Sequence, residues 1–199
     1  TYPWICVKKE PFPRVFLTRK FKKDGSLYFG PYSSVMHAHK LLELINNLFR
    51  LRSCNLTLSY DGIASSKYKV CLDYHLKRCL APCVGYISQE QYQEQIDSIT
   101  DILKGNSSHL IREFDRKMKE AASKLEFELA NEYKEKKILL EKHYSKSMVV
   151  HSTEKNMDVF SLIFEGSDAF GNHMKIRNGC IIRCINLHIK MRIEEEQSS

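Results

Sequence analysis

Four cysteines, Cys54, Cys71, Cys79 and Cys83, are the residues whose type and spacing most clearly suggest chemistry in this chain. They are separated by 16, 7 and 3 residues and lie in a basic, aromatic-rich stretch. Thiolates gathered in this way commonly hold a metal ion or an iron–sulfur cluster. Zinc sites usually contain two close cysteine pairs, and only the last pair is close here, a pattern that iron–sulfur clusters often use. Zinc, and buried thiols without any metal, are the alternatives.

The other three cysteines, Cys6, Cys180 and Cys184, lie in apolar, strand-like surroundings, and we expect the last two to be core residues. An odd total of seven cysteines without secretory features argues against a disulfide framework. It indicates a reducing, cytoplasmic environment. No apolar run approaches the roughly 20 residues that a membrane helix needs, so no membrane contact is expected.

Positive charge and aromatic residues are concentrated in residues 1–86. This part holds 14 Lys and Arg against 5 Asp and Glu, and 13 of the 21 aromatic residues of the chain. Such a composition suits the neutralisation of phosphates together with contacts to bases or sugars. A solvated basic face over an aromatic core would have the same composition. The basic residues expected to contact phosphates are Arg14, Arg19, Lys20, Lys22 and Lys23.

Residues 1–86 are expected to form a small β/α region around the cysteines. Apolar runs bounded by turn residues predict strands, and the apolar spacing after Ser33 or Ser34 predicts a capped helix. Residues 53–70 are expected to be a loop, because Asp61-Gly62 interrupts any regular pattern. The predicted elements are strands at 4–8, 14–18 and 27–29 and a helix that runs to about residue 49.

Residues 87–147 have the apolar spacing of amphipathic helices. Ser88-Gln-Glu-Gln91 matches a capping box at the start of the first helix, which Gly105 ends. Two further helices, with a narrow apolar seam and a polar face dense in Lys and Glu, are predicted up to about Tyr144. They are expected to form a helical hairpin. Its seam is completed either by a partner chain or by packing against residues 1–86.

Residues 148–199 change to the alternation of β-strands. β-branched and apolar residues recur up to residue 190, and Asn178-Gly179 predicts a two-residue hairpin turn. We therefore expect a short antiparallel meander at the C-terminal end. The chain as a whole is expected to have an α+β fold in three parts, at residues 1–86, 87–147 and 148–199.

Several short motifs, in the same order as in a known family, extend over essentially the whole chain. They are Tyr2-Pro-Trp-Ile-Cys-Val, Phe12-Pro-Arg-Val, Tyr28-Phe-Gly-Pro-Tyr32, Lys69-Val-Cys-Leu-Asp-Tyr-His75, Cys79-Leu-Ala-Pro-Cys-Val-Gly85 and Glu126-Phe-Glu-Leu-Ala130. Through them the chain resembles UvrC, the nuclease subunit of the bacterial UvrABC nucleotide excision repair system. The resemblance implies binding to damaged double-stranded DNA. It also implies that the four cysteines hold a [4Fe–4S] cluster, with zinc as the alternative.

The last of these motifs resembles the UVR motif, through which UvrC binds UvrB. The resemblance therefore implies that the helical hairpin binds UvrB. In this chain Lys134-Glu135 replaces the usual Arg-Asp, and Lys137 stands where an aliphatic residue is expected. The residues expected to contact the partner are Phe127, Glu128, Ala130 and Tyr133.

Neither incision centre of the family is expected in this chain. UvrC proteins begin with a GIY-YIG domain for the 3′ incision, and the chain starts just past where that domain should end. Residues 157–190 resemble the approach to the RNase-H-like domain that makes the 5′ incision. The expected function is that of a central UvrC fragment that binds DNA and UvrB without a nuclease centre. A zinc-dependent nucleic-acid-binding module with an oligomerising hairpin is the alternative, and a free-standing nuclease is disfavoured because no plausible set of carboxylates can be assembled.

Overall fold

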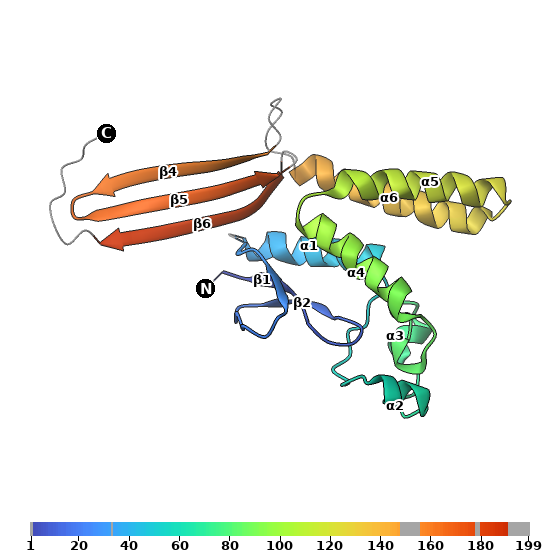
Figure 1. The fold of residues 1–199 in the computed structure, drawn as a ribbon. Helices are drawn as coiled ribbons and strands as arrows, with labels where there is room; N and C mark the ends of the chain where they lie inside the picture. Colours follow the sequence, from blue (N-terminus) through green and yellow to red (C-terminus); the bar gives the residue numbers. More distant parts are fainter. Residues whose placement is uncertain (1, 33, 148–155, 178–179, 191–199) are drawn as a thin grey trace.

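The computed structural model describes residues 2–32, 34–147, 156–177 and 180–190 (Figure 1). It has an α+β fold, as predicted, with two antiparallel sheets of three strands each and helices between them in the sequence. None of the described helices is long and apolar enough to cross a lipid bilayer.

The N-terminal sheet consists of the three strands that the sequence predicts, in the order β2-β1-β3. Both pairings are antiparallel, and Ile5 in the central strand lies opposite Leu17 on one side and Phe29 on the other. Ile5 is fully buried, because its strand has neighbours on both edges and helices over one face. The strands are β1 (Trp4–Val7), β2 (Val15–Thr18) and β3 (Leu27–Phe29).

Helix α1 (Val35–Leu48) packs against this sheet. Ser34 is the N-cap residue, and its hydroxyl accepts a hydrogen bond from the backbone N–H of His37 at 3.3 Å. Apolar residues recur every three or four positions, so one face of the helix enters the core. A fully buried Leu or Ile contributes about 1.5–3 kcal/mol relative to its exposed state. The buried residues of α1 are Ala38, Leu41, Leu44, Ile45 and Leu48.

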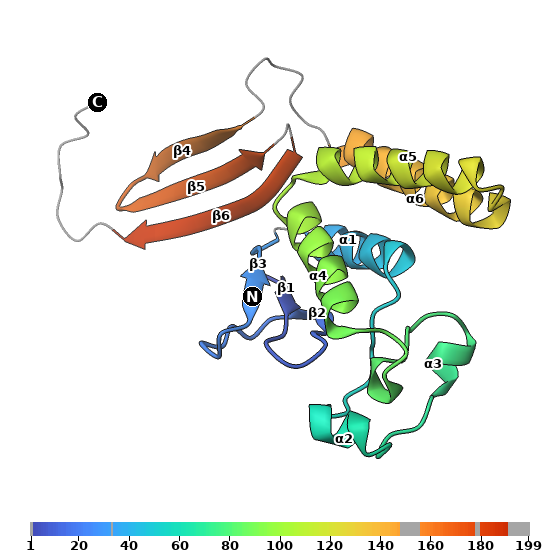
Figure 2. The same cartoon turned by 45° about the vertical axis from the view of Figure 1, so that its right-hand side comes forward.

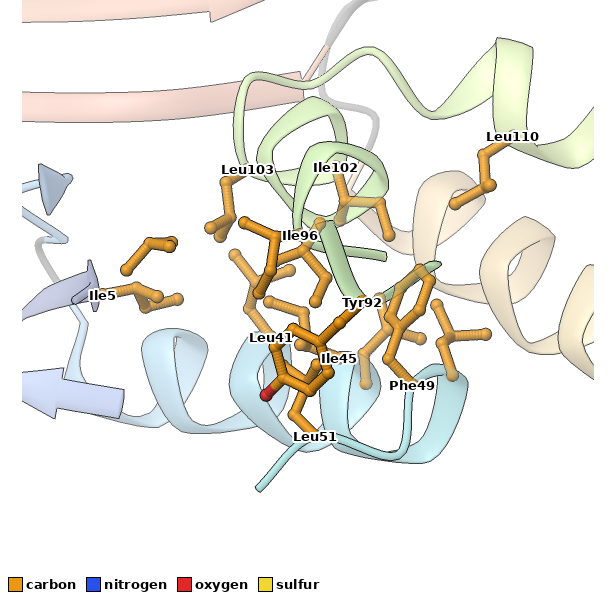
Figure 3. Packing of buried hydrophobic residues seen from close by; sticks show 14 of the residues in the cluster. Ile5, Leu41, Ile45, Phe49, Leu51, Tyr92, Ile96, Ile102, Leu103 and Leu110 are labelled. Carbon is orange, nitrogen blue, oxygen red and sulfur yellow. The ribbon is translucent and has the colours of Figure 1, made fainter. Parts of the chain in front are cut away.

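Helix α4 (Gln89–Leu103) supplies the other side of the core, as Figure 3 shows. Ser88 and Gln91 form the predicted capping box. The buried residues of α4, among them Tyr92 and Ile99, belong to the same hydrophobic cluster as Ile5 of the sheet. The core is therefore continuous from the N-terminal sheet to the end of α4, and it extends beyond residue 86.

The segment between α1 and α4 contains the four cysteines and three short helical turns: α2 (Tyr60–Ala64), α3 (Leu72–His75) and the 3-10 turn η1 (Pro82–Val84). Figure 2 shows that α2 and α3 lie far from the second sheet. Helix α2 occupies part of the segment that was expected to be a loop. The Ser59 hydroxyl caps it by accepting a hydrogen bond from the Gly62 N–H at 3.1 Å. A Cβ atom at Gly62 would lie 2.8 Å from both Ser59 Oγ and Tyr68 OH, so this glycine is required by close packing.

The predicted helical hairpin is formed by α5 (Ser107–Ser123) and α6 (Phe127–Ser147). Gly105, at a φ of +84°, separates α4 from α5, as expected for a glycine that ends a helix. Leu140 of α6 is fully buried and belongs to the main hydrophobic cluster. The hairpin is therefore attached to the core at its open end, while its tip extends away from the rest of the molecule (Figure 1).

The C-terminal sheet is the predicted antiparallel meander, with β4 (Met157–Glu165), β5 (Asp168–Arg177) and β6 (Cys180–Lys190) in sequential order. The turn predicted at Asn178-Gly179 lies outside the described residues. Many large apolar side chains of this sheet are exposed, and Phe160 is 72% exposed.

Candidate cysteine centre and nucleic-acid interface

The four cysteines of the predicted centre come from one segment between α1 and α4. Cys54 lies in extended chain after α1, Cys71 is the N-cap residue of α3, Cys79 follows α3, and Cys83 lies in η1. Cys79 and Cys83 are buried, Cys54 is half-buried and Cys71 is exposed. All four are thiols that take part in no disulfide.

Hydrogen bonds fold this segment back on itself. The carbonyl oxygen of Asp73 accepts a hydrogen bond from the Cys79 N–H at 3.2 Å. The carboxylate of Asp73 accepts another from Ser53 Oγ at 2.7 Å. Since Ser53 precedes Cys54, one aspartate links the parts of the chain that carry the first and third cysteines. Ala81 adopts a left-handed backbone conformation, and its N–H donates to Cys79 Sγ at 3.3 Å.

Electrostatic interactions connect the four thiols. Burial raises the pKa of Cys79, the N–H of Ala81 opposes this, and the three other thiols each raise the pKa further. Burial also raises the pKa of Cys83, and Cys54 and Cys71 add to the effect. Four thiolates would repel one another, so without a cation the thiol form is favoured. Among the residues that the structure describes, no three His, Cys, Asp or Glu side chains are grouped as the ligands of a single metal ion.

Arg52 joins the cysteine segment to the N-terminal sheet, and the sequence analysis did not predict this role. Its side chain is 1% exposed. Its Nε donates to the carbonyl oxygen of Phe12 at 2.7 Å, and its Nη1 donates to that of Leu56 at 2.8 Å. Its Nη2 lies 2.9 Å from Glu10 Oε1, and its Nη1 lies 3.9 Å from Cys54 Sγ. The only sequence signal was its position two residues before Cys54.

Two further side chains complete this polar network. Burial alone would raise the pKa of Glu10, but the hydrogen bonds and charges of Arg14 and Arg52 bring it below its ordinary value. The Tyr92 hydroxyl accepts a hydrogen bond from the Arg52 N–H at 3.2 Å and donates one to the Pro13 carbonyl oxygen at 3.0 Å. Burial raises the pKa of Tyr92, so this hydroxyl keeps its proton. The start of the cysteine segment is thus fixed to both the sheet and α4.

Four of the five residues predicted to contact phosphates lie in the loop between β2 and β3, which we call the basic loop (residues 19–23). They are exposed, and none forms an ion pair with another described residue. Phe21 of the same loop is 57% exposed and packs its ring against those of Trp4 and Tyr28. Arg14 differs, because Glu10 binds its Nε at 2.7 Å and so neutralises its charge. The residues of the basic loop with free charge are Arg19, Lys20, Lys22 and Lys23.

The four residues predicted to bind a partner lie in two environments. Phe127 and Glu128, at the start of α6, are exposed, and Phe127 is 66% exposed. Ala130 is buried, and the ring of Tyr133 lies 6.3 Å from that of Phe114 in α5. Ala130 and Tyr133 therefore form part of the seam inside the hairpin, whereas Phe127 lies outside it.

An ion pair crosses the hairpin at Lys137, where an aliphatic residue was expected. Lys137 Nζ lies 2.7 Å from Asp115 Oδ1 of α5, and Lys119 Nζ lies 2.7 Å from Asp115 Oδ2. Hydrogen bonds from Lys119 and Lys137 lower the pKa of Asp115 to about 2. The lysine is accommodated because a carboxylate of the facing helix pairs with it.

Comparison with known proteins gives a consistent result. Residues 2–102 match the family described as UvrC/Cho excinuclease, middle domain. The chain is 46% identical over 195 residues to the UvrABC system protein C of Flavobacterium johnsoniae, which covers 98% of the chain and 33% of that protein. It is 46% identical over 198 residues to the protein of the same name from Bacteroides thetaiotaomicron, covering 99% of the chain and 32% of the relative. The chain thus spans about a third of the length of these relatives. No solved structure matches it.

Proposed function

The chain belongs to the UvrC/Cho excinuclease family, and from this premise we propose that it is the central, non-incising part of a UvrC subunit of nucleotide excision repair. In this role it binds DNA and UvrB and holds a metal centre. The observation that carries the proposal is similarity over 98% of the chain to UvrABC system protein C. The four interacting thiols and the exposed basic loop support it.

The proposed cofactor is a [4Fe–4S] cluster held by Cys54, Cys71, Cys79 and Cys83. The donor set fits, because a cluster of this kind takes four cysteine thiolates. When bound, the cluster supplies four iron–sulfur bonds to the chain and an iron centre able to exchange an electron. The guanidinium of Arg52 offsets thiolate charge near Cys54, and the Ala81 N–H donates to the sulfur of Cys79. The Ala81 hydrogen bond favours the deprotonated sulfur of Cys79 that iron requires.

Metal analysis of anaerobically purified protein tests the cofactor. A bound cluster gives a brown protein that absorbs near 400 nm, with iron and acid-labile sulfide in stoichiometric amounts. The alternative, a zinc-dependent nucleic-acid-binding module, gives a colourless protein with one zinc ion per chain. A preparation with neither metal, in which all four thiols react with a thiol reagent without loss of structure, would reject both forms of the proposal.

The proposed DNA contact is the basic loop, with its four exposed cations. Phosphate contacts position a protein without reading sequence, which suits an enzyme that must act at any lesion. Each phosphate contact contributes about 0.9 to the slope of log affinity against log salt on duplex DNA. Lys22→Gln should therefore lower this slope by about one. Arg14→Gln should leave it unchanged, because Glu10 already pairs with Arg14. Equal slopes for wild type and Lys22→Gln would contradict the proposed contact.

The proposed contact with UvrB is the tip of the helical hairpin. Leu125, Phe127 and Leu129 are 74%, 66% and 40% exposed there. A hairpin tip with three exposed apolar side chains is suited to burial against a partner. Ala130 and Tyr133 would support this surface from inside the hairpin.

A further inference from the structure

An open cleft of about 840 Å³ lies beside the cysteine centre, and Cys79 forms part of its lining. Its volume is within the range of about 300–1,000 Å³ that is typical of pockets for small ligands. Its walls come from α3, from the chain on both sides of η1, from Arg50 just after α1 and from Glu132 of α6. In both views α3 lies on the opposite side of the N-terminal region from the loop that joins β2 and β3 (Figures 1 and 2). The cleft is therefore distinct from the basic loop.

Aromatic side chains line one part of this cleft. The ring centroids of Tyr74 and Tyr86 are 5.3 Å apart, with 59° between the ring planes. His75 contacts Tyr74 edge to face at 5.5 Å. Because the two tyrosine rings are tilted and not stacked, each keeps a face free of the other. Tyr86 is 64% exposed, although it lies in a concave part of the surface.

The charges in the cleft favour an anionic ligand. Arg50 and Lys77 contribute two cations, and Glu132 is the acidic residue of the lining. Glu132 is already paired, at 3.1 Å with Arg50 and at 2.8 Å with Lys136. Burial alone would raise the pKa of Glu132, but these cations and Lys77 bring it below its ordinary value. Lys77 is exposed and forms no direct ion pair with another described residue.

We propose that this cleft binds an unpaired nucleotide of DNA, whose base stacks on Tyr86 and whose phosphate contacts Lys77. The inference rests on the proposed DNA-binding function and adds a second site, with a different specificity, to the basic loop. An aromatic side chain can stack only on a base that has left the duplex stack. The site therefore selects locally opened DNA, whereas the basic loop contacts the backbone of any duplex.

The test compares two labelled probes by fluorescence anisotropy. One is a duplex with a short unpaired bubble, and the other is a fully paired duplex with the same flanking sequence. The variants are Tyr86→Ala, Tyr86→Phe and, as a matched control, Tyr60→Ala. Tyr60 is a tyrosine of the neighbouring α2 that is 50% exposed and lies outside the cleft. Thermal unfolding of each variant confirms that the chain is folded.

Stacking on one base contributes about 1–3 kcal/mol, so Tyr86→Ala should weaken bubble binding about tenfold and leave duplex binding unchanged. Tyr86→Phe keeps the ring and should bind both probes like the wild type, as should Tyr60→Ala. Equal affinity of wild type and Tyr86→Ala for the bubble would overturn the inference and leave the basic loop in place. If the wild type binds neither probe, both the inference and the proposed DNA-binding function fail. Loss of UvrB binding in Tyr86→Ala, with bubble binding intact, would instead assign the cleft to a protein.

Discussion

Replacement of Arg52 by methionine should lower the free energy of unfolding, because it removes the contacts that join the cysteine segment to the N-terminal sheet. Methionine fills a similar volume but cannot donate a hydrogen bond. It would remove the hydrogen bonds to the carbonyl oxygens of Phe12 and Leu56 and the ion pair with Glu10. The two carbonyl oxygens would then lack a hydrogen-bond donor. Water cannot easily replace it, because the Arg52 side chain is only 1% exposed.

The size of the effect follows from these contacts. A hydrogen bond to a charged group contributes about 1.5–3 kcal/mol, and two of them are lost. The burial of a methionine side chain offsets about 1.5 kcal/mol of this loss. The expected net loss of about 3 kcal/mol agrees with the cost of about 3–5 kcal/mol for breaking a buried ion pair. For a chain of this size it corresponds to a fall in Tm of about 10 °C.

Urea unfolding, followed by the fluorescence of the single tryptophan, Trp4, measures the difference. Arg50→Met is the matched control, because Arg50 is an arginine two positions away whose side chain is 41% exposed in its ion pair with Glu132. An exposed pair of this kind contributes at most about 1 kcal/mol. Equal unfolding midpoints for Arg52→Met and Arg50→Met would refute the reasoning, since they would show that burial of the guanidinium does not matter.

Three further predictions concern the cofactor, the partner and pH. Cys79→Ser should lower the iron content of anaerobically purified protein about tenfold or more. Loss of a residue that only supports the ligands already weakens metal binding about tenfold, and this substitution removes a proposed ligand itself. Phe127→Ala should raise the Kd for UvrB about thirtyfold, the effect of removing an interface side chain that contributes about 2 kcal/mol. Burial lowers the pKa of His37 and His143 below the ordinary 6.5. The unfolded chain then binds more protons than the folded one as the pH falls below 6.5, so the free energy of unfolding should decrease from pH 7 to pH 5.

Each of these predictions has a control within the chain. Cys6→Ser removes a buried thiol of the N-terminal sheet and should leave the iron content unchanged. Leu72→Ala removes an apolar side chain that is 69% exposed, away from the hairpin, and should not affect UvrB binding. His37→Phe keeps a ring beside Tyr32 and should flatten the dependence of stability on pH. Iron retained in Cys79→Ser would contradict the cluster ligand, and wild-type UvrB binding by Phe127→Ala would contradict the partner contact. A stability that rises as the pH is lowered would contradict the role of the buried histidines.

Elements with strong local signals could be predicted from the sequence. Ser34 caps α1, and Ser88 with Gln91 forms the capping box of α4, because these side chains bond to backbone groups within three residues. The strands of both sheets also follow from their own apolar patterns. The assignment of the cysteines to a cluster, of the basic loop to DNA and of the hairpin to UvrB stays a prediction.

Features that depend on distant contacts could not be predicted. Arg52 is buried because Phe12 and Glu10, about forty positions earlier, approach its guanidinium. Gly62 suggested a break, yet it lies inside α2, where a Cβ atom would lie 2.8 Å from the hydroxyl of Tyr68. Phe127 has the apolar character of a seam residue, but the hairpin closes through other side chains and leaves it exposed.

The hydrophobic core that runs through α4 determines how small an autonomous folding unit can be. A chain shortened after residue 86 would lose Tyr92 and Ile99, and water would reach the faces of α1 and β1 that they cover. A chain that ends at Gly105 would keep Tyr92 and Ile99 but would lose Leu110, Phe114 and Leu140, which belong to the same cluster. The smallest unit that keeps the whole core therefore includes the helical hairpin.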